Sequence, residues 1–119
     1  MYEEKIVLCG ANSYEEKYYL NQDFDSLPQH IKEDLQIMCV LFTADVGGVL
    51  TLEFEEDGSL VFCVQVDEMD LLFDEIGSQL KIKELQNTKK ELLESLELYY
   101  KVFFLGEDVE GEVAKGEDA

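Results

Sequence analysis

The residues of this chain that could do chemistry are mainly carboxylates, and three aspartates form the most regular group. Asp67, Asp70 and Asp74 are spaced three and four residues apart, so a helix through them would place all three on one face. Three carboxylates on one face could hold a hard cation such as Ca²⁺ or Mg²⁺. No histidine lies nearby in the sequence, and no second carboxylate pair of the di-iron type accompanies them. A solvated first turn, favoured by the helix dipole, is therefore the preferred interpretation, and a metal site is the alternative.

A second group of carboxylates matches only part of a calcium-binding loop. Glu53, Glu55, Asp57 and Gly58 occupy positions one, three, five and six of that pattern. The twelfth position is Val64, where the pattern requires a bidentate glutamate. Because the same segment alternates apolar and polar residues like a β-hairpin, we do not expect it to bind calcium.

Nucleophilic catalysis and phosphate binding have no recognisable motif in this sequence. His30, the only histidine, lies beside the apolar Ile31 on the expected surface of a helix, with no nucleophile at catalytic spacing. Gly47 and Gly48 are not followed by the lysine and hydroxyl residue of a phosphate loop, so they indicate a helix end. We therefore expect no enzyme activity and no cofactor.

The cysteines indicate a reducing compartment. Cys9, Cys39 and Cys63 are odd in number, have no CxxC spacing and lie among apolar residues, which is typical of buried free thiols. The N-terminal residues are acidic and the chain has no apolar run of membrane-spanning length. We expect a cytoplasmic protein with no signal peptide and no membrane association.

The charge of the chain is its unusual feature. It holds 28 acids against 9 bases, all lysines, for a formal net charge of -19. The absence of arginine together with this charge argues against nucleic-acid binding, and an anionic membrane would repel the chain. The acid-rich stretch between Lys32 and Lys81 has no basic residue. It predicts a solvated surface, with a docking face for a basic partner, or a mimic of nucleic acid, as the alternative.

Periodicity predicts the strands that would position these residues. Residues 5–10 are β-branched and apolar, as in a buried strand. Residues 14–21 fit either a short helix or a strand paired with the first, and we favour the strand. Residues 49–54 and 60–66 alternate with a period of two around Asp57-Gly58, which predicts an antiparallel hairpin.

Two helical regions complete the expected α+β domain, which spans residues 1–106. Ser26 should cap a helix that ends before Gly47, and residues 35–42 are apolar nearly all round, as in a central helix. Residues 68–105 should be helical with a break near Gly77, where Ser78 could cap the second piece. We expect a small antiparallel sheet, made of the N-terminal strands and the hairpin, packed against the central helix and a long C-terminal helix.

The C-terminal helix carries the candidate interface. Residues 96–105 (LELYYKVFFL) are too apolar to be covered on one side only. They fit the domain core, or a homodimer with these interface candidates: Leu96, Tyr99, Tyr100, Phe103 and Phe104. Residues 107–119 hold six acids and one lysine, which predicts a disordered tail.

Four runs of the sequence resemble a known family. They are YEEKIVLCGAN (2–12), EEKYYLN (15–21), DVGGVLTLEF (45–54) and ELYYKVFFLGED (97–108). They are similar to a domain-of-unknown-function family of small acidic bacterial proteins, and the resemblance covers nearly the whole chain up to Asp108. It brings no activity and no functional residue, and it implies a bacterial cytoplasmic protein.

The function that this sequence favours is a non-enzymatic protein-interaction module with an acidic surface and a protein partner of unknown identity. Two alternatives stay open. One is a small, acidic, secretion-type chaperone, by analogy of size, charge and composition. The other is a carboxylate metal-binding protein or enzyme that uses Asp67, Asp70 and Asp74.

Overall fold

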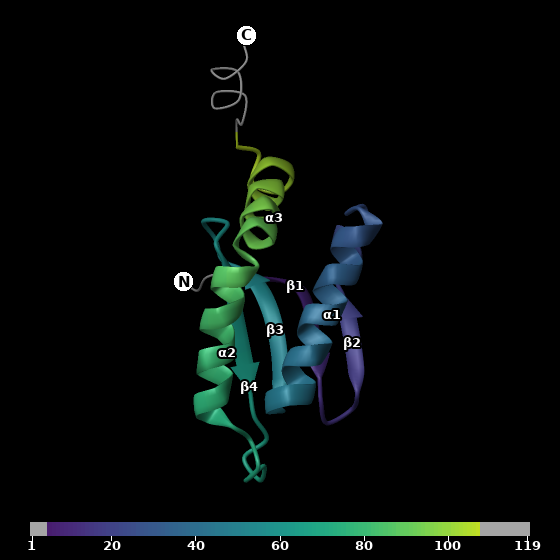
Figure 1. Ribbon diagram of the computed structural model, residues 1–119. Helices are drawn as coiled ribbons and strands as arrows, with labels where there is room; N and C mark the ends of the chain where they lie inside the picture. The colour runs from purple at the N-terminus through teal and green to yellow at the C-terminus, as the bar shows by residue number, and fades with distance from the viewer. Residues whose placement is uncertain (1–4, 108–119) are drawn as a thin grey trace.

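The computed structural model describes residues 5–107, which form four strands and three α-helices in an α+β fold (Figure 1). The elements in chain order are β1 (Ile6–Asn12), β2 (Lys17–Leu20), a single 3-10 turn η1 (Gln22–Phe24), α1 (Gln29–Val46), β3 (Val49–Phe54), β4 (Leu60–Gln65), α2 (Glu75–Thr88) and α3 (Lys90–Phe103). The fold class expected from the sequence is confirmed.

The sheet consists of two hairpins joined side by side. Its strand order is β2-β1-β3-β4 and every neighbouring pair is antiparallel. The strand predicted in residues 14–21 and the hairpin predicted at 49–66 are both confirmed. Gly58 closes the second hairpin at a φ of 92°, with its N–H donating to the Glu55 carbonyl oxygen. β2 and β4 are the two edges of the sheet.

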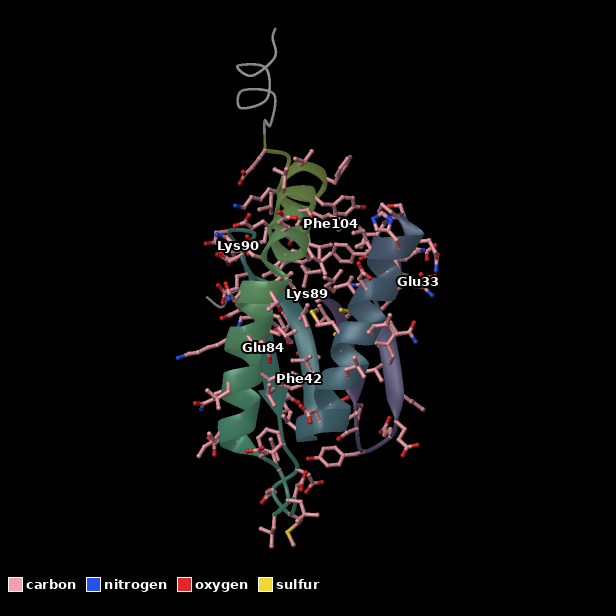
Figure 2. The ribbon with its side chains drawn as sticks, in the orientation of Figure 1. Glu33, Phe42, Glu84, Lys89, Lys90 and Phe104 are labelled. Carbon is pink, nitrogen blue, oxygen red and sulfur yellow. The ribbon has the colours of Figure 1, made fainter. Side chains whose placement is uncertain are left out.

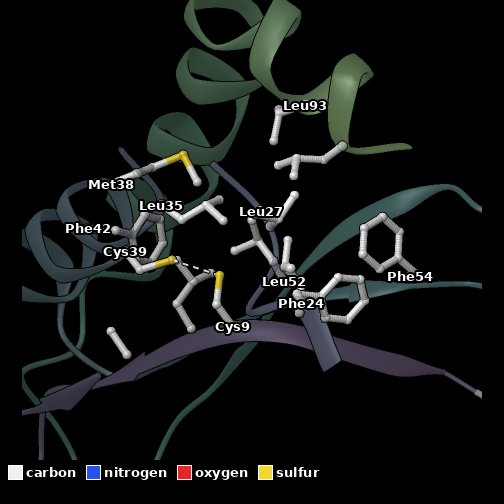
Figure 3. Packing of buried hydrophobic residues seen from close by; sticks show 14 of the residues in the cluster. Cys9, Phe24, Leu27, Leu35, Met38, Cys39, Phe42, Leu52, Phe54 and Leu93 are labelled. Carbon is white, nitrogen blue, oxygen red and sulfur yellow. Dashed lines mark hydrogen bonds between the residues drawn. The ribbon is translucent and has the colours of Figure 1, made fainter. Parts of the chain in front are cut away.

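The three helices lie on one side of this sheet, and the core fills the space between the two layers (Figure 1). Leu35, Met38, Cys39 and Phe42 recur at helical spacing on the buried side of α1, facing Cys9 of β1 (Figure 3). The ring of Phe54 stacks on Tyr100 at a centroid distance of 4.2 Å and so joins β3 to α3. This arrangement leaves the other face of the sheet without a helix in the described chain.

The structure corrects two expectations about α1. Pro28 occupies its N-cap position with no side-chain cap, and the Ser26 hydroxyl lies 2.9 Å from the Tyr99 hydroxyl instead. Ile37 and Leu41 are exposed, so α1 is not a central helix covered on all sides. The reason is the two-layer architecture, because the sheet covers only one side of each helix.

The expected helix at residues 68–105 is wrong at its start and at its break. Residues 66–74 form turns, α2 begins at Glu75, and the chain breaks at Lys89 between α2 and α3. Asp74, and not Ser78, caps α2, since its Oδ1 accepts a hydrogen bond from the Gly77 N–H at 2.8 Å. Aspartate side chains that accept nearby backbone N–H groups compete with helix formation. The acidic tail predicted at 107–119 lies, from residue 108 on, outside the described residues.

Candidate docking groove

A groove of about 550 Å³ lies between β4 and α2. Phe62 and Val64 of β4 line one wall, and Ser78, Gln79 and Ile82 of α2 line the other. Ser78 and Gln79 precede Ile82 by four and three residues, so the three positions form one face of the helix. The side chains of Phe62 and Val64 point into the groove because they share the helix-facing side of the sheet with their β3 partners, Leu52 and Leu50.

The mouth of the groove is acidic. The lining also includes Asp67, Glu68 and Asp70 from the segment after β4 and Glu75 from the first turn of α2, together with Val66 and Phe73. It has no lysine or histidine. Lys81, on a different face of α2, pairs with Asp45 at 3.2 Å. The lining therefore combines apolar side chains with carboxylates that no lysine of the groove balances. We call Phe62, Val64, Phe73 and Ile82 its apolar floor, and Asp67, Glu68, Asp70 and Glu75 its acidic rim.

The segment between β4 and α2, residues 66–74, displays apolar side chains to solvent beside this rim. Leu71 and Leu72 are 91% and 93% exposed, and Met69 is exposed to a similar degree. The side chains of this segment project from the end of the protein below α2 (Figure 2). Ile76, in the first turn of α2, extends the exposed apolar surface. Clustered exposed apolar side chains mark interaction surfaces in soluble proteins, so this segment is a candidate for one.

Hydrogen bonds hold this segment in one conformation. The Tyr14 hydroxyl, at the turn between β1 and β2, donates to Asp70 Oδ2 at 2.6 Å and accepts from the Asp67 N–H at 3.0 Å. The hydrogen bond to Asp70 raises the pKa of Tyr14. Asp67 and Asp70 also accept the N–H groups of Met69 and Leu72. The apolar side chains are thus presented on an ordered turn.

The outer edge of β4 is a second recognisable feature of the groove. In an antiparallel ladder only alternate residues bond to a given neighbour. The Glu55 N–H donates to the Ser59 carbonyl oxygen, which fixes Ser59 as a residue that bonds to β3. Every second residue after Ser59 therefore also bonds to β3, namely Val61, Cys63 and Gln65. The residues between them direct their backbone groups outward, namely Leu60, Phe62 and Val64. The Leu60 N–H follows this rule, since it donates to Glu97 of α3 at 2.8 Å. Phe62 and Val64 have no such partner in the described chain.

The aspartates that sequence spacing placed on one helical face do not share one. Asp67 and Asp70 lie in turns and Asp74 is the cap of α2. Each uses a carboxylate oxygen to accept a backbone N–H, which leaves them facing different groups. Within residues 5–107, no three His, Cys, Asp or Glu side chains are placed so that they could hold a metal ion together.

The interface candidates of α3 divide into two groups. Leu96 and Tyr100 are buried in the core of the domain, and Tyr99 is half-buried. Phe103 is 71% exposed, so it lies outside the core. Phe104 follows the end of α3, where its ring stacks on Phe24 at 4.7 Å (Figure 2).

The remaining candidates for chemistry are separated from one another. His30 is exposed near the start of α1. Cys9 and Cys39 are free and buried, as predicted, with their sulfur atoms 3.8 Å apart. Cys63 is half-buried on the helix-free face of the sheet, where burial and then the Glu53 carboxylate raise the pKa of its thiol. A raised pKa keeps a thiol protonated and unreactive near neutral pH.

The groove was not predicted from the sequence, although the acidic and apolar residues that form it are evident there. The run from Glu68 to Ile76 mixes acids with large apolar residues, and the sequence predicts a helix there. An amphipathic helix would show apolar residues at helical spacing, whereas Leu71, Leu72 and Phe73 are consecutive. That departure was the available signal. None of the helices in the described chain is long and apolar enough to cross a membrane.

Comparison with known proteins identifies the chain at the level of family. Neither a curated protein nor a solved structure matches it. The sequence model of a family of unknown function, DUF6145, matches residues 5–108, which include every element of the sheet and all three helices. The chain therefore belongs to the DUF6145 family.

Proposed function

We propose that this protein is a non-enzymatic interaction module that binds a partner protein at the groove between β4 and α2. The observation that carries the proposal is the union of an apolar floor, an acidic rim and the adjoining exposed leucines Leu71 and Leu72. A partner would gain free energy by removing these side chains from water, at about 25 cal/mol for each Å² of apolar surface buried. The acids would select partners by charge.

The charge of the chain favours selective binding at this surface over non-specific apolar association. A net charge of -19 opposes aggregation between copies of the chain, which favours solubility despite the exposed leucines. The same charge speeds the approach of a cationic partner at low ionic strength. Surface charge would thereby speed the encounter with the partner, and apolar contact would stabilise the complex once it has formed.

Affinity purification from the native organism tests the proposal with matched variants. Leu71→Ser with Leu72→Ser changes only exposed side chains, so folding should be retained. Ile37→Ser, on the exposed side of α1, is the control. We expect one stoichiometric partner to bind the wild type and the control and to be lost from the double variant. Equal recovery with all three proteins would contradict binding at this groove.

A secretion-type chaperone is the second candidate, and the exposed apolar segment 66–74 specifically favours it. A chaperone would hold unfolded or partly folded clients on that segment without requiring one sequence. The purified protein should then suppress aggregation of several unrelated proteins, and Leu71→Ser with Leu72→Ser should abolish the effect. A protein that binds one partner and protects no unrelated client would exclude this candidate.

The homodimer expected through α3 stays a prediction. Of its candidate residues, Phe103 and Phe104 keep substantial exposed surface, while Leu96 and Tyr100 serve the core. Light scattering at high micromolar concentration measures it, with Phe103→Ser as the variant. A monomer under these conditions would remove the dimer from consideration.

A further inference from the structure

We propose that the groove binds an extended segment of a partner protein, with apolar and cationic side chains, as a fifth strand antiparallel to β4. This inference rests on the proposed function and specifies its partner. The outward backbone groups of Phe62 and Val64 supply the hydrogen bonds, the groove accepts alternate side chains, and the acidic rim contacts lysine or arginine.

The two edges of the sheet differ in the way that such binding requires. β2 is four residues long and begins with the exposed Lys17, and short charged edges discourage strand pairing. β4 is six residues long, LVFCVQ, and has no charge, proline or bulge in its pairing with β3. An edge of this kind is a template for an added strand.

The geometry of β4 determines the side-chain pattern of the added strand. Residues paired with Phe62 and Val64 would place their side chains on the helix-facing side, in the groove. The intervening residues would lie on the helix-free face, beside Val61 and Cys63. The partner segment should therefore alternate, with apolar residues at the positions that face the groove.

The rim determines where the positive charges belong. Asp67, Glu68 and Asp70 follow the C-terminal end of β4, so an antiparallel strand would bring its amino-terminal end beside them. We favour the antiparallel direction because every pair in the sheet is antiparallel and this pairing is slightly more stable per residue. The predicted segment carries lysine or arginine first and alternating apolar residues after them.

Charge argues against the other occupants. An antiparallel second copy would bring the N-terminal end of its own β4 beside the rim. Glu55, Glu56 and Asp57 precede that end, so like charges would meet there. Residues 107–119 of this chain hold six acids against one lysine and would be repelled as well. A cationic helix could pair with the rim, but its own backbone groups are already bonded, so it would cover the outward backbone groups of Phe62 and Val64 without bonding to them.

A synthetic peptide tests the proposal directly. The probe is Lys-Lys-Val-Thr-Val-Thr-Val with blocked ends, titrated by calorimetry into the full chain, with binding mapped by amide chemical shifts. The charge-reversed peptide Glu-Glu-Val-Thr-Val-Thr-Val, also with blocked ends, is the first control. We expect the lysine peptide to shift the Phe62 and Val64 amides, to bind more weakly at high salt, and to outcompete the glutamate peptide.

Backbone methylation separates strand addition from other binding. N-methyl groups on the alternate valines remove the hydrogen-bond donors of one edge of the peptide, and N-methyl groups on the threonines remove those of the other edge. Methylation of the valines, which pair with Phe62 and Val64 and so direct their N–H groups to β4, should weaken binding about tenfold or more, as expected for two or more lost hydrogen bonds. Methylation of the threonines should weaken binding much less. Equal weakening by both sets would overturn strand addition.

A variant of the protein gives a second measurement. Val64→Pro removes an outward N–H that β3 does not use, whereas Val64→Thr keeps it. If both proteins fold, only the proline variant should lose peptide affinity, and retained affinity would overturn the proposal. If the proline variant does not fold, the methylated peptides decide alone.

The outcomes also distinguish this inference from the proposed function. Loss of partner binding in the Leu71 and Leu72 variant, together with equal effects of both methylated sets, would reject strand addition and retain the interaction module. Protection of the Phe62 and Val64 amides that rises with protein concentration would instead assign the edge to a second copy. Protection lost on removal of residues 108–119 would assign it to the chain's own tail. Either of the last two results would overturn the proposal that a cationic segment of a partner protein occupies this edge.

Discussion

The buried thiol pair yields a prediction about stability at alkaline pH. Cys9 of β1 and Cys39 of α1 are both fully buried, with their sulfur atoms 3.8 Å apart (Figure 3). The hydrogen bond with Cys9, and then burial, raise the pKa of the Cys39 thiol. Cys39 therefore stays protonated in the folded protein at a pH where the same thiol ionises in the unfolded chain.

The sign and the size of the effect follow from proton linkage. An unfolded cysteine titrates near pH 8.5, so above about that value the folded state binds one more proton at Cys39 than the unfolded state does. Stability is fully present below the unfolded pKa and falls by about 1.4 kcal/mol for each pH unit above it. Between pH 7 and pH 10, Cys39 alone should remove about 2 kcal/mol from the free energy of unfolding.

Urea denaturation under reducing conditions measures this loss. The free energy of unfolding is determined from about pH 7 to about pH 10 for the wild type and for Cys39→Ala, where the buried thiol is absent. The variant should be less stable at every pH because it leaves a small cavity, but its stability should decline less steeply. The two proteins are otherwise identical, so the difference between their slopes reports Cys39. The same slope in the two proteins would refute the reasoning, since it would mean that Cys39 has no raised pKa in the fold.

Two further predictions test the elements that position the groove. Asp74→Ala removes the cap of α2 and should lower the free energy of unfolding by about 1 kcal/mol in urea denaturation, whereas Asp74→Asn, which can still accept from the Gly77 N–H, should lose less. A loss as large for asparagine as for alanine would contradict the cap. Phe54→Ala should cost about 3 to 5 kcal/mol because the ring is fully buried and stacks on Tyr100, and Phe54→Leu should cost less. Thermal denaturation checks this order, and equal melting temperatures for the two variants would contradict it.

Local patterns were sufficient for the strands and the tight turn. The period of two in residues 49–54 and 60–65 encodes which side chains are buried, and Gly58 permits the positive φ that closes the hairpin. These signals work because strand alternation and turn geometry depend on neighbours within a few residues. The same applies to the end of α1 at Gly47.

Local patterns failed where side chains compete with the backbone or where a helix meets another layer. Asp67, Asp70 and Asp74 are compatible with a helix by spacing, yet their carboxylates accept backbone N–H groups and form turns and a cap. Leu41 and Phe103 are apolar but exposed, because the sheet covers one side of the helical layer and nothing in the described chain covers the other. Hydrophobicity alone does not reveal which side a neighbour will cover.

The sequence by itself determined the α+β composition, the acidic arginine-free surface, the burial of Cys9 and Cys39, and the hairpin that contains β4. Only the tertiary structure decided that β1 pairs with β3, which makes β4 an edge and places the acidic turns beside it. The physical reason is the separation along the chain over which each interaction acts. Alternation and turn chemistry act between near neighbours, whereas the pairing of β1 with β3 spans the whole of α1 and depends on the packing of the complete core.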